Sequence, residues 1–197
     1  MAQVMRHASL CKSRADGFSS RGDLLEETVR KIGSCGGVPT VVYGESGTGK
    51  TSLLAKAAQE VGAMWTARAI EAESAQLTWG RRAVVITRFC GITPASNDAR
   101  SLLRSLCEQL SIVYDEQPTP VADSYRELVK EFKDRLVNSP SDRPLGIFID
   151  SLDQLTNDYM ARSDLLWLPT VRRGAKSPTS VVNSPSPLTR TPLDSRR

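Results

Sequence analysis

Apolar positions recur along the chain with two spacings, one typical of helices and one typical of buried strands. Four segments place apolar side chains three and four positions apart, which predicts helices over residues 23–32, 51–61, 96–110 and 125–137. A short β-rich run predicts a buried strand over residues 38–43, and a second strand is expected over residues 83–89. The continuous apolar run at residues 145–149 predicts a third strand of the kind buried in parallel sheets. Because strands and helices alternate, the sequence predicts an α/β fold with helices on both faces of a parallel sheet.

The two ends of the chain lack this patterning. Residues 1–17 are polar and basic without an apolar run, so we expect a flexible N-terminal segment and no signal peptide. From residue 170 onward, prolines are interspersed with Ser, Thr and Arg, which is typical of segments too polar to order themselves. The expected organisation is therefore a flexible segment (1–17), one domain (18–169) and a disordered basic tail (170–197).

Charge and composition exclude several classes of protein. The net charge is +4, but residues 172–197 carry six basic side chains against Asp194, so the rest of the chain is slightly acidic. The basic balance therefore gives no reason to expect nucleic acid as a partner of the domain. No apolar run has the length of a membrane span, so no membrane partner is expected. The four cysteines form no C-x-x-C pair, and reduced thiols are the simplest interpretation.

One motif carries definite chemistry. The segment between the first predicted strand and the next helix reads Gly44-Glu45-Ser46-Gly47-Thr48-Gly49-Lys50-Thr51, a G-x-x-x-x-G-K-[ST] phosphate-binding loop, or P-loop. Its glycines let backbone N–H groups wrap a phosphate, and the following helix adds its positive end. Lys50 is expected to meet the β- and γ-phosphates of a nucleoside triphosphate, and Thr51 to bind Mg²⁺.

A second candidate follows the strand predicted at 145–149. Asp150 ends this buried run and fits a Walker B acid that holds Mg²⁺. Asp153 lies three residues further on and is the candidate catalytic residue, orienting the attacking water. Alone the pattern is weak, because many strands end in an Asp that caps the next helix. The P-loop about a hundred residues upstream favours the metal role.

Together these residues resemble a NACHT domain of the STAND class of P-loop signalling ATPases, and are most similar to NACHT and WD-repeat proteins. The stretches that carry the resemblance are 18–25, 41–51, 88–93 with 102–107, and 147–155. The resemblance implies binding of ATP or GTP with Mg²⁺, a role in signal transduction, self-association or association with a longer parent protein, and a cytoplasmic location.

The chain departs from the family pattern at three places. Ser19-Ser20-Arg21 replaces a frequent Val-Gly-Arg near the expected base site, and Asp153-Gln154 replaces a frequent Asp-Glu. The similarity stops at Pro169, where the family continues into a sensor strand; Val181-Val182 is too short and too proline-flanked to replace it. We therefore expect an incomplete P-loop sheet, without the sensor strand and later elements, in a truncated or alternatively ended chain.

Three functions fit this pattern to different degrees. The first is a nucleotide-binding module of a STAND-type signalling ATPase, with weak or no hydrolysis in the isolated chain. The second is a non-catalytic interaction fragment that binds or competes with its parent protein. The third is a P-loop kinase, which is disfavoured because no arginine-rich lid sequence is present.

Overall fold

The computed structural model describes residues 2–34, 39–72, 83–114, 120–140, 143–168 and 179–184. In chain order, its longer helices are α1 (Ala2–Asp16), α2 (Gly22–Ser34), α3 (Lys50–Ala72), α4 (Ala99–Tyr114) and α5 (Tyr125–Val137). The strands are β1 (Thr40–Val41), β2 (Val84–Phe89), β3 (Leu145–Asp150) and β4 (Thr179–Ser184). Short 3-10 turns are η2 (Pro94–Ser96), η3 (Leu152–Gln154) and η4 (Asp158–Met160).

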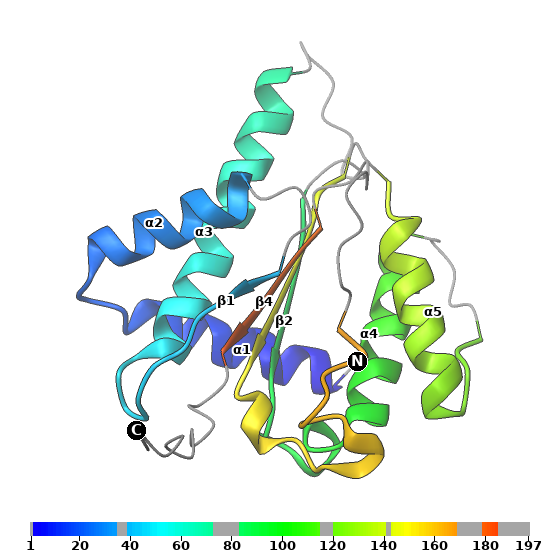
Figure 1. The fold of residues 1–197 in the computed structure, drawn as a ribbon. Helices are drawn as coiled ribbons and strands as arrows, with labels where there is room; N and C mark the ends of the chain where they lie inside the picture. The colour runs from blue at the N-terminus through cyan, green and yellow to red at the C-terminus, as the bar shows by residue number, and fades with distance from the viewer. Residues whose placement is uncertain are drawn as a thin grey trace, which may run out of the picture.

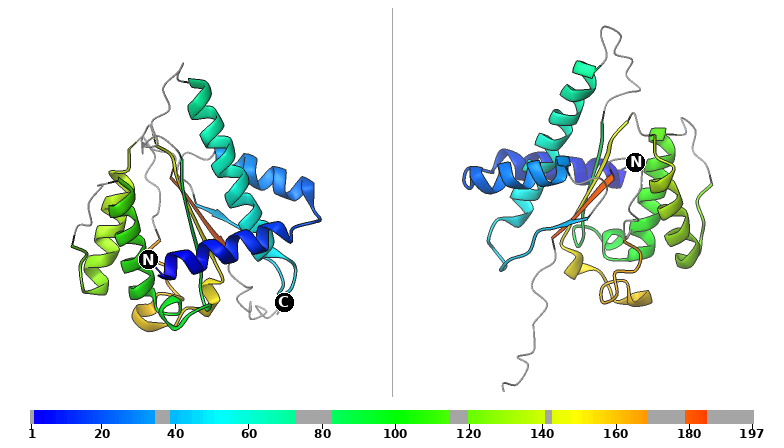
Figure 2. Two further views of the ribbon diagram at one scale, coloured as in Figure 1. Left: turned by 180° about the vertical axis from the view of Figure 1, so that it is seen from behind. Right: turned by 45° about the horizontal axis from the view of Figure 1, so that its top comes forward.

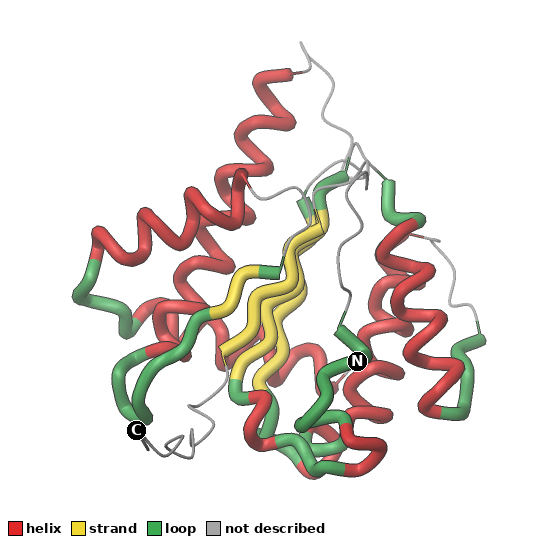
Figure 3. The backbone as a smooth tube through the Cα atoms, viewed as in Figure 1, coloured by secondary structure: helices red, strands yellow, loops and turns green. Residues whose placement is uncertain are grey.

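The described strands form one parallel sheet in the order β1-β4-β3-β2. Figure 1 and Figure 3 show the sheet between two groups of helices. Along β3, Ile147 and Ile149 face the core under α4 and α5, whereas Phe148 faces the core under α1, α2 and α3. All six residues of β3 are buried, as expected for a strand covered on both faces. The predicted three-layer α/β fold with a parallel sheet is confirmed.

All four predicted helices are present, although α3 runs to Ala72, well beyond the predicted end at residue 61. The helix predicted at 125–137 has those bounds, and Ser124 caps it by accepting a hydrogen bond from the Glu127 N–H. Helix α4 is capped by Asp98, whose carboxylate accepts from the Ser101 N–H at 2.8 Å. Both helices bury their leucine-rich faces in one core. No helix within the described ranges has the combined length and apolar character to cross a membrane.

The N-terminal segment contradicts the expectation of flexibility. Residues 2–16 form helix α1, which lies across the sheet and packs against α3 (Figure 2). Its buried side chains are His7, Cys11 and Ala15, spaced four residues apart on one face. Sequence reasoning missed this helix because none of the three is strongly apolar, so the hydrophobic pattern carried little signal.

His7 also completes the edge of the sheet. Its Nδ1 accepts a hydrogen bond from the Phe89 N–H at 3.1 Å, on the side of β2 that faces away from β3. The ring is 1 % exposed. Burial, together with the nearby charge of Arg88, lowers its pKa from 6.5 to about 4. His7 is therefore a neutral acceptor that blocks part of an otherwise open strand edge.

The tail prediction also needs correction. Residues 179–184 form β4, which pairs with all of β3 and with β1, and so lies between the strand that precedes the P-loop and the strand that ends in Asp150. Pro178 and Pro185 stand one residue outside the strand, so neither removes an N–H from the ladder. The sheet is small, as predicted for an incomplete P-loop fold, but its central position is filled. Residues 169–178 and 185–197 of the predicted tail lie outside the described residues.

Candidate functional site

The P-loop connects β1 to α3 at the carboxyl end of the sheet. Gly47 and Gly49 have φ angles of 79° and 81°, a left-handed conformation that other residues adopt only with strain. Within this turn the Thr48 hydroxyl donates to the Glu45 carbonyl at 2.8 Å. The chain therefore enters α3 at Lys50 with the helix N-terminus and its free N–H groups beside the loop.

Lys50 folds back over this loop. Its Nζ donates to the carbonyl oxygens of Gly44, at 2.9 Å, and of Glu45, at 2.7 Å. The ammonium is thereby held at the loop by weakly basic oxygens rather than by a carboxylate. Phosphate oxygens carry more negative charge than carbonyl oxygens, so a phosphate entering the loop can take over these contacts.

Thr51 and Asp150 meet although they are 99 residues apart in the sequence. The Thr51 hydroxyl donates to Asp150 Oδ2 at 2.7 Å, joining the first turn of α3 to the end of β3. Asp150 is 2 % exposed, and the Ser151 hydroxyl also donates to Oδ2, at 3.2 Å. The structure thus brings the two predicted metal ligands together, as a hydroxyl and a carboxylate.

This donor set fits Mg²⁺ rather than a softer ion. Mg²⁺ binds oxygen and is typically held by one or two carboxylates plus water and substrate phosphates. No cluster of three or more His, Cys, Asp or Glu side chains suited to a metal occurs among the described residues. A metal at Thr51 and Asp150 would therefore depend on nucleotide phosphates for the rest of its coordination.

Asp153 lies in η3, just beyond β3, and is half-buried. Burial and the charges of Asp150 and Asp153 together raise the pKa of the Cys90 thiol to about 12, so both carboxylates lie near this residue. The Cys90 N–H donates to the Asp150 carbonyl at 3.0 Å. Asp153 therefore lies at the same end of the sheet as Asp150.

A cavity of about 280 Å³ adjoins the loop. It lies between residues 17–21, the turn from α1 to α2, and residues 47–53 of the loop and α3. Arg21 reaches across it, with Nη1 donating to the Thr48 carbonyl at 2.8 Å. The resemblance places the base near Ser19-Ser20-Arg21, and this geometry is consistent with that position. Residue patterns alone did not single out Arg21, because a lone exposed arginine carries no motif signal.

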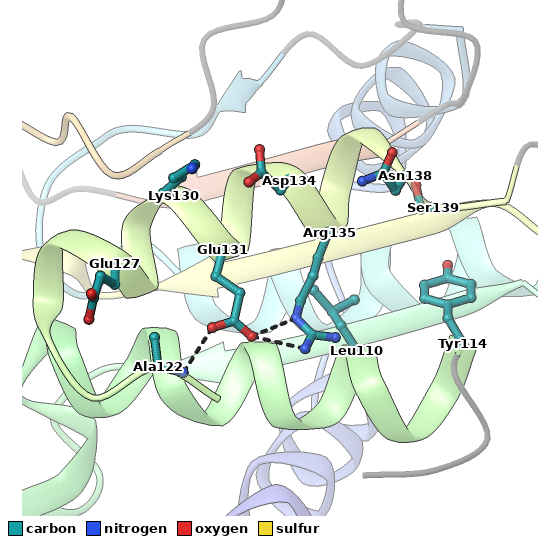
Figure 4. Close-up of a pocket in the computed structure, with 10 residues that line it drawn as sticks. All are labelled: Leu110, Tyr114, Ala122, Glu127, Lys130, Glu131, Asp134, Arg135, Asn138 and Ser139. Carbon is teal, nitrogen blue, oxygen red and sulfur yellow. Dashed lines mark hydrogen bonds and ion pairs between the residues drawn. The ribbon is translucent and has the colours of Figure 1, made fainter. Parts of the chain in front are cut away.

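Larger cavities lie elsewhere but lack this chemistry. One of about 590 Å³ lies between α4 and α5 (Figure 4). In this cavity the Glu131 carboxylate accepts hydrogen bonds from Arg135 Nε and from the Ala122 N–H, both at 2.9 Å. The charges of Glu131 and Arg135 therefore already neutralise each other. Another, of about 700 Å³, lies between α2 and α3. Neither is lined by residues of the P-loop or by Thr51 and Asp150. The smaller cavity beside the P-loop is therefore the better site.

Comparison with known sequences agrees with this geometry. Residues 22–174 match the family described as the AAA ATPase domain. The chain belongs to this family. The match includes the P-loop, Asp150 and Asp153. The chain is accordingly a nucleotide-binding P-loop NTPase module.

Among curated relatives, the chain is 34% identical over 174 residues to human NACHT and WD repeat domain-containing protein 2. It is 29% identical over 159 residues to human NACHT domain- and WD repeat-containing protein 1. These matches cover 85% and 77% of the chain, and the resemblance to NACHT and WD-repeat proteins is confirmed. The chain spans only 9% of the length of each relative.

A solved structure agrees with the fold. The ORC1 protein of Aeropyrum pernix, determined in complex with DNA, superposes with a TM-score of 0.52. The match covers 89% of this chain and 41% of that protein, at 14% sequence identity. At this identity the likeness concerns the fold alone, and the bound DNA is a property of that protein.

Proposed function

We propose that the chain binds ATP together with Mg²⁺ and serves as the nucleotide-responsive module of a STAND-type signalling ATPase. The observation that carries the proposal is the 2.7 Å contact between Thr51 and Asp150, directly beside the P-loop turn. A metal-binding pair next to a phosphate cradle is the arrangement that nucleoside triphosphates require. GTP would suit the same phosphate site, and the cavity at residues 17–21 is where the base would be distinguished.

Each residue has a defined task in this proposal. The loop N–H groups and Lys50 hold the β- and γ-phosphates, and Thr51 with Asp150 holds the metal. Mg²⁺, when bound, neutralises charge on the phosphate oxygens. Asp153 orients a water molecule for attack. We propose that hydrolysis is weak, because Gln154 stands where relatives of this type often carry a second acid.

The proposed location and binding partners follow from the charge of the chain and from its resemblance to NACHT domains. Outside the basic tail the chain is slightly acidic, which disfavours the phosphate backbone of nucleic acids as a partner. We propose a cytoplasmic location, with self-association or binding to a longer parent protein as the functional contact. Analytical ultracentrifugation with and without ATP checks this, because a nucleotide-driven contact raises the sedimentation coefficient only when nucleotide is present.

The Lys50→Ala change tests the phosphate site. It removes the charge that meets the phosphates and leaves the backbone cradle in place. We expect at least a tenfold loss of ATP affinity in calorimetry, equivalent to about 1.4 kcal/mol. Lys56→Ala is the matched control, since Lys56 lies on the same helix and pairs with Glu60 at 3.1 Å. Equal affinity of the Lys50 variant and the wild type would rule out the loop as the site.

A second pair of variants separates the two acids. Asp150→Asn is expected to weaken ATP binding in the presence of Mg²⁺ by about tenfold, but not in its absence, because a metal ligand is lost. Asp153→Asn is expected to leave both affinities unchanged and to lower phosphate release. If both variants reduce Mg²⁺-dependent binding equally, the division of roles between metal and water is wrong.

A further inference from the structure

The two side chains that follow Leu152 contact each other. Gln154 Nε2 donates a hydrogen bond to Asp153 Oδ2 at 2.8 Å. Side chains of adjacent helical residues normally point in different directions, so this pairing is not a default of the 3-10 turn. One oxygen of the candidate catalytic carboxylate thus has a fixed donor. The other oxygen stays available to a water molecule.

Gln154 is held in turn by the loop that follows β2. Gly91 has a φ angle of 87°, and a Cβ built at this position would lie 3.0 Å from Gln154 Cβ and 3.1 Å from Cγ. The backbone of Gly91 therefore lies directly against the aliphatic part of Gln154. A side chain at position 91 would displace Gln154 and would also strain the backbone.

The same loop is fastened to the chain on the far side of Gln154. The Thr156 N–H donates to the Asn97 carbonyl at 2.7 Å. The loop itself is braced by Ser96, whose hydroxyl accepts from the Thr93 N–H at 2.8 Å and donates to the Thr93 carbonyl at 2.7 Å. The segments after β2 and β3 are thus joined on both sides of Gln154, by the Cys90 to Asp150 hydrogen bond before it and by the Thr156 to Asn97 hydrogen bond after it.

We infer that Gln154 is a positioning residue: it uses its amide to orient the Asp153 carboxylate, and it transmits the position of the loop at residues 91–97 to that carboxylate. The inference rests on the proposed function, in which Asp153 orients the attacking water. It assigns the glutamine a role as donor, whereas the frequent glutamate at this place could only accept.

The contact can be read without any turnover. In ¹⁵N–¹H NMR spectra of the full chain with ATP and Mg²⁺, the two Gln154 Nε2 protons are expected to differ in shift from those of a free glutamine side chain. Asp153→Ala should return them to free values. Asp158→Ala is the control, since Asp158 accepts from the neighbouring Thr156 hydroxyl at 2.8 Å and should leave the signal in place. Gln154 signals at free values in the wild type would overturn the inference.

Turnover separates positioning from a merely structural role. Gln154→Ala is expected to slow single-turnover ATP hydrolysis about tenfold, as misplacement of a catalytic group does, with ATP affinity unchanged. A rate at or above that of the wild type in Gln154→Ala would contradict the inference. A failure of this inference can be told apart from a failure of the proposed function. The proposed function is tested by whether Lys50→Ala loses ATP affinity.

Discussion

A chain that ends after residue 178 is expected to lose its cooperative unfolding transition. This truncation removes β4, whose six residues pair with Leu145–Asp150 and whose Val182 and Asn183 also pair with β1. Without it, β1 and β3 keep unpaired N–H and C=O groups at the centre of the sheet. Each such buried group costs about 1–3 kcal/mol, so several of them exceed the 5–15 kcal/mol by which a typical domain is stable.

Two further variants make this prediction specific. A chain that ends after residue 184 keeps every strand pairing described here and is expected to unfold cooperatively. Val182→Pro keeps the length but removes one hydrogen bond from the middle of a central strand and leaves its acceptor unpaired, which should lower stability by about 1–3 kcal/mol. Thermal unfolding followed by circular dichroism distinguishes the three. If the chain ending at 178 melts as the wild type does, β4 is not part of the stable sheet.

The wild type is expected to lose about 2 kcal/mol of unfolding free energy through His7 between pH 7 and pH 4.5. The folded pKa of His7 is about 4, against an ordinary value of 6.5, so the unfolded chain binds more protons in this window. The His7 contribution is therefore fully present above about pH 6.5, falls as the pH drops and levels off below about pH 4. The whole shift is worth about 3 kcal/mol, and screening by water lowers the expected effect to about 2 kcal/mol.

The matched variant for this test is His7→Gln. The glutamine oxygen can accept the Phe89 N–H bond but does not titrate. Since His7 is the single histidine of the chain, no other imidazole contributes to the difference between the two proteins. Urea unfolding at several pH values is expected to show that the wild type loses about 2 kcal/mol more unfolding free energy than His7→Gln between pH 7 and pH 4.5. Parallel stability curves for the two proteins from pH 7 to pH 5 would show that His7 does not dock α1 as a neutral acceptor.

Sequence patterns predicted those elements whose own residues carry the signal. The strand Leu145–Asp150 is apolar throughout, and α5 repeats Leu128, Phe132 and Leu136 on one face, so burial could be inferred locally. The P-loop is a fixed spacing of residue types with a direct chemical purpose. Thr51 and Asp150 could be paired because both follow parallel strands, whose carboxyl ends lie at one edge of a sheet.

The elements that were missed depend on partners far away in the chain. Helix α1 is stabilised by small and polar contacts such as His7 with β2, which no local pattern reveals. Strand β4 is surrounded by prolines and has only Val181-Val182 as an apolar pair, yet it gains hydrogen bonds from two neighbours at once. Conversely, β1 spans Thr40–Val41, shorter than the strand predicted over residues 38–43, of which residue 38 lies outside the described residues. In α1 and β4, tertiary contacts outweigh the weak local signal.

The central claim is that this chain is a nucleotide-binding module that uses Mg²⁺. The most direct measurement is calorimetric titration of the 197-residue protein with ATP, once with Mg²⁺ and once with EDTA. We predict saturable binding with Mg²⁺ and at least tenfold weaker binding without it, a difference of about 1.4 kcal/mol. The absence of saturable heat at millimolar ATP, in protein that unfolds cooperatively, would contradict the account.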